Sequence, residues 1–247
     1  MTRVRTDGAS KRVSCLRPVG TGGEDTETVL SIAERETAIR LLAAAAHETV
    51  SADRPCLSAT LPGSGARVQA MLAPLVSAPI LAIRKKPSRI FTFGDYAAAG
   101  IATDLQIQQL RAAIGQNRNI VVAGGTGSGK TTLLNACLAE PDYNAARVII
   151  LEDTAELQCT GADVVQLLIK RTPPAITMRD LVQMTLRLRP DRIVVGEVRD
   201  GAALEVLKAW NTGHPGGLLT LHANSAADAL TRLEDLCLKR ACCGQSA

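Results

Sequence analysis

The sequence predicts an α/β fold: a mostly parallel sheet covered by helices on both faces, preceded by a smaller α+β unit. Beyond about residue 100 the chain alternates short apolar runs with longer helical patterns, the usual order of strand–helix–strand units. The apolar runs are hydrophobic throughout, as in strands buried on both faces. Aromatic residues make up only 2% of the 247 residues and hydrophobic ones 46%, so the core has to be built from Ala, Val, Leu and Ile.

The first part of the chain divides into a leader and a small unit. Residues 1–28 are rich in Gly, Ser, Thr and charge without periodicity, which predicts a disordered leader. Residues 29–98 form the predicted α+β unit, which begins with a helix over 29–50. A Pro-Gly-Ser-Gly turn is expected between its first two strands. The strands are expected in PCLSATLP, ARVQAMLAPLV and ILAIRKK.

Residues 99–247 form the predicted parallel-sheet domain. Thr103 and Gln106 have the spacing of a capping box for its first helix, DLQIQQLRAAIGQ. Its strands are expected in NIVVAGG, RVIILED, VVQLLI, DRIVVGEV and GLLTLHA. Its other helices are expected in GKTTLLNACLAE, TMRDLVQMTLRLR, GAALEVLKAWNTG and SAADALTRLEDLCLKR.

Composition narrows the class of protein. The net charge of +4 comes from scattered basic residues, which does not predict a nucleic-acid or membrane surface. The seven cysteines include no CxxC pair, so neither a zinc site nor a secreted disulfide framework is favoured. The sequence has neither an apolar run long enough to span a membrane nor the apolar region of a secretory signal. A cytoplasmic protein with reduced thiols is expected.

Residues 124–131 read GGTGSGKT, a complete G-x-x-x-x-G-K-[ST] motif between a predicted strand and a predicted helix. In this context the curled backbone and the helix N-terminus direct N–H groups at phosphate oxygens. Lys130 is expected to bridge the β and γ phosphates, and the Thr131 hydroxyl to hold Mg²⁺. The alternative is a glycine-rich turn that only joins strand to helix. The residues expected to bind nucleotide here are Gly124, Gly125, Thr126, Gly127, Ser128, Gly129, Lys130, Thr131 and Thr132.

Acidic residues end two of the predicted strands. Glu197 ends RIVVGE, the position of a Walker B acid, and Glu152 and Asp153 end VIILED. Open α/β sheets bind ligands at the carboxyl ends of their strands, where such acids can hold a metal or orient water. Each acid could equally cap the helix or loop that follows.

Basic residues near the motif have two interpretations. Arg187 and Arg189, in LRLRPD, either complement the end of a helix or reach phosphate. The run from Arg84 to Lys86 is either a solvated strand end or a contact for the nucleotide domain that follows it. The residues alone leave both alternatives open.

Two histidines bound the stretch GHPGGLLTLHANS. His214 and His222 lie at opposite ends of its apolar run and have no nearby cysteine, which argues against a metal site. A histidine-based nucleophile also lacks its partners. His222 is therefore either a sensor of the terminal phosphate, acting on it directly or on the acid that holds the metal, or a structural histidine.

Four stretches together resemble the Walker A, Asp, Walker B and His boxes of the secretion traffic ATPases: GGTGSGKTT, ILEDTAELQ, LRLRPDRIVVGEVRDGAA and GHPGGLLTLHANS. The sequence is most similar to the TrbB-type ATPases of conjugal transfer, over about residues 33–239. This resemblance implies a RecA-like P-loop ATPase domain that follows a small α+β domain and uses ATP and Mg²⁺. It also implies a homo-oligomeric, hexameric ring at the cytoplasmic face of the inner membrane, in contact with secretion channel proteins.

The same resemblance assigns roles to single residues. It implies that Glu152 is the catalytic base, Glu197 the acid associated with Mg²⁺ and His222 the His-box residue, with Arg187 and Arg84 in contact with phosphate. The predicted function is an ATP-hydrolysing motor subunit that energises pilus assembly or substrate transfer. Recognition of a specific nucleic-acid sequence is not expected.

Both ends depart from the pattern of this family. The leader stands where the family has a strand-rich start, and the chain ends within RACCGQSA where the family continues. These differences predict truncation at both ends. They leave open an alternative function, a non-catalytic remnant that binds nucleotide.

Overall fold

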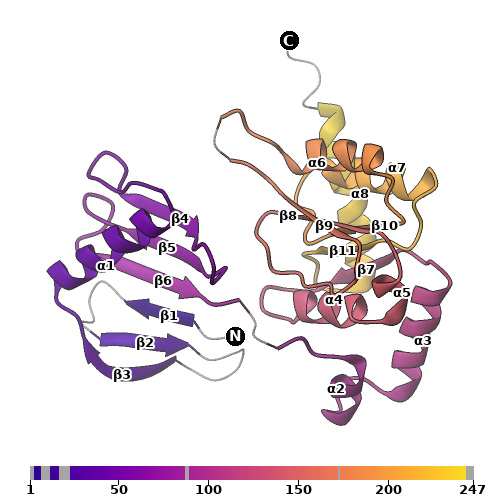
Figure 1. The fold of residues 1–247 in the computed structure, drawn as a ribbon, viewed down its shortest axis with the longest axis horizontal. Coiled ribbons are helices and arrows are strands. Elements are labelled where there is room, and N and C mark those ends of the chain that lie inside the picture. The colour runs from indigo at the N-terminus through magenta and orange to yellow at the C-terminus, as the bar shows by residue number, and fades with distance from the viewer. Residues whose placement is uncertain (1–2, 7–11, 17–22, 87–88, 172, 243–247) are drawn as a thin grey trace. The chain divides into compact units, whose positions relative to one another are not determined.

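The computed structural model describes residues 3–6, 12–16, 23–86, 89–171 and 173–242, with side-chain surroundings at 29–86, 89–171 and 173–238. The chain forms two compact units, residues 1–88 and 89–247, each with its own sheet (Figure 1). The division falls before the expected boundary at residue 98. The reason is that Phe93 packs into a core of the second unit, together with Ile107 and Ile114.

The first unit is a six-stranded antiparallel sheet with one helix on it. The strand order is β3-β2-β1-β6-β5-β4. Helix α1 buries Ile39 and Ala43, four residues apart on one face, against Leu57, Val68 and Leu81 of the sheet. The elements are β1 (Arg3–Thr6), β2 (Arg12–Leu16), β3 (Gly23–Val29), α1 (Ile32–Ala45), β4 (Cys56–Thr60), β5 (Arg67–Met71) and β6 (Ile80–Arg84).

Local sequence signals explain the ends of these elements. Ser31 and Glu34 form a capping box: the Ser31 hydroxyl accepts from the Glu34 N–H, and the Glu34 carboxylate accepts from the Ser31 N–H. The predicted turn between β4 and β5 is confirmed, with Gly63 and Gly65 at φ values of +74° and +61°. Side chains with a Cβ atom rarely adopt these values, so glycine is needed there.

The first residues of the chain differ from the expectation of a disordered leader. Where residues 1–28 are described, they form β1, β2 and most of β3, and β1 pairs with β6 in the same sheet. Composition missed these strands because a strand depends on pairing: β2 pairs with β1 and β3, and β1 also pairs with β6, which is distant in the sequence. Val, Thr and Cys in RVRT and RVSCL are compatible with strands, but only the pairing makes them so.

The second unit confirms the predicted α/β fold. Its five strands are all parallel and lie in the order β7-β11-β10-β8-β9. The sequence pattern missed the short helices α2 and α5 and one 3₁₀ turn, η1. The elements are α2 (Phe93–Ala98), α3 (Asp104–Gly115), β7 (Ile120–Ala123), α4 (Lys130–Leu138), α5 (Pro141–Asn144), β8 (Val148–Glu152), β9 (Val164–Leu168), α6 (Met178–Thr185), η1 (Leu186–Leu188), β10 (Arg192–Val195), α7 (Ala202–Asn211), β11 (Leu218–Leu221) and α8 (Ala226–Cys242).

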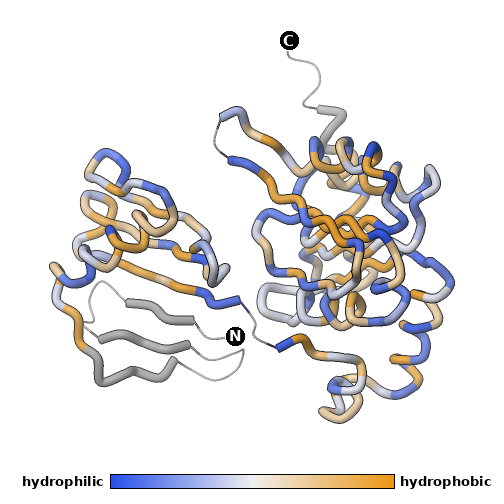
Figure 2. Tube along the Cα trace, viewed as in Figure 1, coloured by the Kyte–Doolittle hydropathy of each residue, from blue (hydrophilic) through white to orange (hydrophobic). Residues whose placement is uncertain are grey.

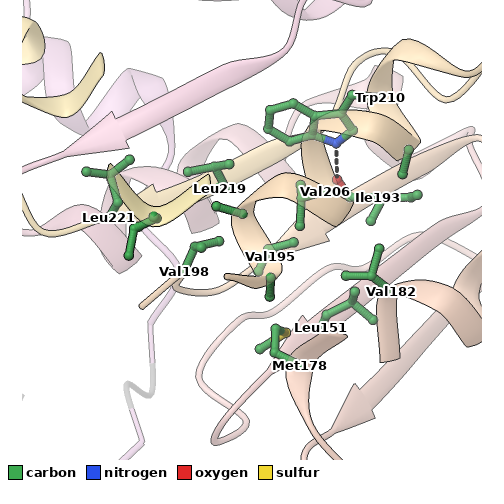
Figure 3. Packing of buried hydrophobic residues seen from close by; sticks show 14 of the residues in the cluster. Leu151, Met178, Val182, Ile193, Val195, Val198, Val206, Trp210, Leu219 and Leu221 are labelled. Carbon is green, nitrogen blue, oxygen red and sulfur yellow. Dashed lines mark hydrogen bonds between the residues drawn. The ribbon is translucent and has the colours of Figure 1, made fainter. Parts of the chain in front are cut away.

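Helices cover both faces of this sheet, and each face has its own core. Helices α6, α7 and α8 pack on one face, where Trp210 lies against β10 and donates from Nε1 to the carbonyl oxygen of Ile193 (Figure 3). Helices α2 to α5 pack on the other face. The central strands are hydrophobic along their length (Figure 2), because alternate residues face the two cores.

The parallel arrangement puts every strand's carboxyl end at the same edge of the sheet, called the carboxyl edge below. The glycine-rich loop follows β7, and Glu152 is the last residue of β8. Glu197 follows β10 closely, and His222 comes directly after β11. Segments far apart in the sequence therefore meet at this edge.

Candidate active site

Residues 124–129 form a tight loop from β7 to α4. Gly127 and Gly129 have φ values of +77° and +93°, which glycine adopts without strain. A Cβ atom at Gly124 would lie 2.4 Å from the Ser128 hydroxyl oxygen, so this position also has to stay small. The loop follows the curled path predicted for it.

The start of α4 is open to an anion. Its N-cap residue is Gly129, which has no side chain to accept from the N–H groups of the first turn. The ammonium group of Lys130 lies back across the loop and donates to the carbonyl oxygens of Gly124 and Gly125 at 2.8 and 2.6 Å. Free N–H groups and a nearby cation are the features that bind phosphate oxygens.

Glu197 has two carboxylate oxygens in different surroundings. Oε2 accepts from Nη2 of Arg199 at 2.7 Å. Oε1 is buried, lies 3.1 Å from Nε2 of His222, and has no hydrogen bond of good geometry within the described part of the chain. Burial alone raises the pKa of Glu197, but the Arg199 hydrogen bond and the charges of Arg199, His222 and Lys130 outweigh it and hold the pKa below its usual value. This acid is therefore held ionised beside Lys130.

The two histidines of the glycine-bounded run separate as expected. His222 lies beside Glu197 and is 45% exposed. His214, before β11, contacts the carbonyl oxygen of Pro190 through Nδ1 at 2.9 Å. Across the described residues, no group of three His, Cys, Asp or Glu side chains could hold a metal. The interpretation of His222 that the geometry favours is action through the acid.

Glu152 lies at the same edge but faces inward. Its side chain is 2% exposed, and Oε1 accepts from the N–H groups of Glu156 and Leu157 at 2.9 Å each. Oε2 accepts from the side-chain amide of Gln166. Burial raises the pKa of this carboxyl group above its usual value, and the three hydrogen bonds oppose that rise in part. In this arrangement the carboxylate shapes the loop after β8.

Asn135 holds the same loop from the other side. It is a buried residue of α4, and its Oδ1 atom accepts from the Gln158 N–H at 2.8 Å. The helix that begins at the phosphate loop is thus tied to the loop that carries Asp153. Sequence reasoning missed Asn135, because a single polar residue in an apolar helix has no distinctive pattern.

Arg199 was also missed. It bonds Glu197 and lies 3.7 Å from Asp153, which is bonded to Arg171 at 2.7 Å. A signal was present, because in an extended segment residues two apart point to the same side, and Arg199 follows Glu197 at that spacing.

Arg187 does not join this group, contrary to the prediction that it contacts phosphate. It lies in η1, before β10 begins, and therefore at the opposite edge of the sheet from the carboxyl edge. Arg189 shares this position. Contacts of Arg147, just before β8, with Leu188 and Asp191 confirm the placement. The physical reason is that a helix connecting parallel strands runs back along the sheet, so its last residues reach the amino ends of the strands.

Arg84 belongs to the first unit. It is the last residue of β6 and is paired in register with Arg67 of β5. Its contact with phosphate, which the resemblance implied, stays a prediction.

A pocket of about 770 Å³ opens beside the phosphate loop, within the second unit. Its lining includes Tyr96 of α2, Gln106 and Leu110 of α3, and Ser128, Gly129, Lys130, Thr132 and Leu133. Most of the lining is apolar, with side-chain amides at positions that can bond a ligand. The pocket is thus continuous with the proposed phosphate site.

The four cysteines whose side chains are described take no part in the site. Cys56, Cys137, Cys159 and Cys237 are all free thiols. Burial raises the pKa of Cys137 to about 12, so this thiol is unreactive at neutral pH.

Comparison with known proteins decides the family. The model of the family described as "Type II/IV secretion system protein" matches residues 26–246. The chain belongs to the type II/IV secretion system protein family. A member from Rhizobium radiobacter, named conjugal transfer protein TrbB, is 48% identical over 209 residues, which are 83% of this chain and 63% of the relative. The chain thus spans less than two thirds of that protein's length.

A second relative and a solved structure are also similar to the chain. The type IV secretion system protein VirB11 of Bartonella henselae is 31% identical over 86% of this chain and 70% of its own length. The solved structure of the ATPase DotB of Legionella pneumophila is 24% identical, with a TM-score of 0.69 over 95% of this chain and 65% of that one. At this identity the likeness to DotB supports the fold alone. The predicted α/β fold, a parallel-sheet domain preceded along the chain by a smaller unit with its own sheet, is confirmed.

Proposed function

We propose that the chain is an ATP-binding and ATP-hydrolysing motor subunit of a conjugal transfer or type IV secretion system. One observation carries the proposal: the glycine-rich loop with Lys130 after β7 and the acid Glu197 after β10 lie at the same edge of one parallel sheet. The names of the TrbB and VirB11 relatives point to the same class of system.

The residues present fit a nucleotide with Mg²⁺. The buried oxygen Oε1 of Glu197 has no hydrogen bond from any described residue, and Mg²⁺ prefers oxygen ligands. Thr131, in the first turn of α4, and Glu197 are the residues proposed to hold the ion, directly or through water. When bound, Mg²⁺ neutralises charge on the phosphate oxygens.

The protein's own groups then have separate tasks. The N–H groups of residues 125–131 and the Lys130 ammonium hold the phosphates, for which Lys130 has to leave the carbonyl oxygens of Gly124 and Gly125. Glu197 orients water through Oε1, and His222 responds to the charge on that acid. Glu152 remains the proposed base, and its raised pKa is in the direction that general-base catalysis favours. To act so, it has to release at least one of its three hydrogen bonds.

The pocket beside the loop is proposed to take the base and ribose. Tyr96 and Leu110 offer apolar surface to a purine ring, and the Gln106 and Gln109 amides can bond its edge. This arrangement supports a nucleotide, because phosphate groups alone need no such surface.

The assembly and its place in the cell are also part of the proposal. We infer a hexameric ring at the cytoplasmic face of the inner membrane, in contact with secretion channel proteins, from the likeness to TrbB and VirB11. No helix in the described segments is long and apolar enough to cross a membrane. Light scattering after size exclusion, with and without MgATP, tests the ring: a particle six times the chain mass supports it, and a monomer at all concentrations contradicts it.

Phosphate release tests the catalytic proposal. Purified protein should release phosphate from ATP only with Mg²⁺. Lys130→Ala, Glu197→Gln and Glu152→Gln should each slow release by about 100-fold or more, because each removes a group that acts on the phosphates or on water. Lys208→Ala, on the exposed side of α7, is the matched lysine control and should leave the rate unchanged.

Two results would count against hydrolysis. The first is a rate no higher than that of Lys130→Ala, with or without added membranes. The second is binding of ATP without turnover, which favours the alternative function of a nucleotide-binding remnant. Fluorescence of a methylanthraniloyl ATP separates these outcomes, since it reports binding independently of hydrolysis.

A further inference from the structure

The carboxyl edge of the parallel sheet carries a series of ion pairs that phosphate binding does not explain. Arg199 is at its centre. Its Nη2 atom donates to Oε2 of Glu197 at 2.7 Å, and its Nη1 atom lies 3.7 Å from Oδ2 of Asp153. Asp153 is also bonded by Arg171 at 2.7 Å. Arg199 therefore joins the acid that follows β10 to the acid that follows β8.

This contact differs from an ordinary surface ion pair. Arg199 is itself 61% exposed, but the side chains of Glu197 and Asp153 are only 22% and 25% exposed, so water screens these acids less than open surface groups. The loop that carries Asp153 is fixed in turn by the buried Glu152 and Asn135. Arg199 thus lies within ion-pair distance, 3.7 Å, of Asp153, an acid on a loop that other contacts hold in place.

The two oxygens of Glu197 show what this contact does. Oε2 accepts a hydrogen bond from Arg199, while the buried Oε1 accepts none from a described residue. The two oxygens are chemically equivalent, so the bond to Arg199 fixes the plane of the carboxylate and not the identity of either oxygen; turning that plane away would break the bond. The bond therefore keeps the unbonded oxygen on the side of His222, at 3.1 Å from Nε2.

We propose that Arg199 is a positioning residue: held by Asp153, it fixes the carboxylate of Glu197 so that Oε1 stays available to Mg²⁺ and its water. The proposal rests on the ATP site proposed above. Arg199 acts through Glu197 and is not itself a catalytic residue. A guanidinium group suits this task because its planar fork can bond two acids at once, which a lysine ammonium does with less definite direction.

Nucleotide binding with and without Mg²⁺ tests the proposal without relying on turnover. The probe is methylanthraniloyl ATP, titrated in excess MgCl₂ and in excess EDTA. Arg199→Ala should weaken binding in MgCl₂ by about tenfold or more, the usual effect of losing a residue that orients a metal ligand, and leave binding in EDTA unchanged. Arg199→Lys should recover part of the loss.

The matched control is Arg179→Ala. Arg179 lies 3.7 Å from Glu205 in an ion pair of partly exposed side chains, outside the site. Its removal should change neither titration. Arg199→Ala placed in a Glu197→Gln background should add no further loss, because a positioning residue has no effect once its target is gone.

Several outcomes would overturn the proposal. Equal binding of wild type and Arg199→Ala in MgCl₂ is one, and an equal loss in MgCl₂ and EDTA is another, since it indicates a damaged fold. If Arg199→Ala does not fold, the same comparison of nucleotide binding in MgCl₂ and in EDTA is made with Arg199→Lys and Asp153→Asn. A loss confined to MgCl₂ supports the proposal, and no loss contradicts it. Wild type with Mg²⁺-dependent binding but no phosphate release contradicts the proposed hydrolysis alone, and the binding data still decide the role of Arg199.

Discussion

Arg192 is a buried cation at the amino end of β10, on the far edge of the sheet from the proposed site. Its guanidinium donates to the carbonyl oxygens of Ile114 and Gly216 and lies 4.5 Å from the ring centre of Tyr143. Among the described side chains, no carboxylate forms an ion pair with it. The carbonyl groups and the aromatic ring therefore replace the water that a buried charge gives up. Arg192 thus joins the last turn of α3 to the loop that precedes β11.

Replacing Arg192 with Met should lower the free energy of unfolding by about 2–4 kcal/mol, because buried carbonyl groups lose their donor. Urea unfolding followed by the fluorescence of Trp210, the single tryptophan of the chain, measures the loss. Arg118→Met, at an exposed position, is the control and should change the free energy by less than about 0.5 kcal/mol. If Arg192→Met lowered the free energy of unfolding by less than about 0.5 kcal/mol as well, the role described for Arg192 would be contradicted.

At the scale of elements, helix starts follow the sequence closely. Helices α1, α2, α3 and α6 each begin with a capping box. The one predicted for α3 is confirmed: the Gln106 N–H donates to the Thr103 hydroxyl at 3.3 Å, and the Thr103 N–H donates to the Gln106 side chain at 2.9 Å. Such signals are readable in the sequence because all their atoms lie within one turn of helix.

Removing the cap of α3 should cost about 1 kcal/mol. Thr103→Ala leaves N–H groups of the first turn without a side-chain acceptor, and Thr103→Ser keeps that acceptor. Unfolding in urea, again followed at Trp210, should place Thr103→Ser within a few tenths of a kcal/mol of wild type. Equal stability of the Ala and Ser variants would show that the cap contributes nothing.

At the scale of the whole molecule, two acids of the site should give stability opposite dependences on pH. The pKa of Glu197 is lowered in the folded protein, so its contribution is present above its ordinary value of 4.5 and is lost as pH falls through the folded pKa. The pKa of Glu152 is raised, so its contribution is present below 4.5 and is lost as pH rises through the folded pKa.

Glutamine variants test these opposite signs. The stability of wild type relative to Glu197→Gln should fall as pH is lowered from about 6 to about 3, whereas its stability relative to Glu152→Gln should rise over the same range. Free energies of unfolding from urea titrations at several pH values supply both differences. The same slope in both comparisons would contradict the surroundings described for the two carboxylates.

The sequence by itself determined most of the helices and strands of the second unit and the functional residues at the ends of its strands. The strand before GGTGSGKT, the acids after β8 and β10 and the histidine after β11 were all predicted, because hydrophobic period, glycine position and capping are properties of neighbouring residues. Parallel strands then bring these ends to one edge. That much of the candidate site needed only local pattern and one rule of sheet geometry.

The tertiary structure decided what depends on contacts between distant segments. The strand order β7-β11-β10-β8-β9 puts His222 beside Glu197, and packing against Gly196 and Gln166 buries Glu152 instead of leaving it open. Pairing of β1 with β6, and of β2 with β1 and β3, makes strands of residues that composition assigned to a leader. Burial and hydrogen-bond partners depend on which segments meet in space. The pattern of one stretch of chain does not identify the segment that packs against it.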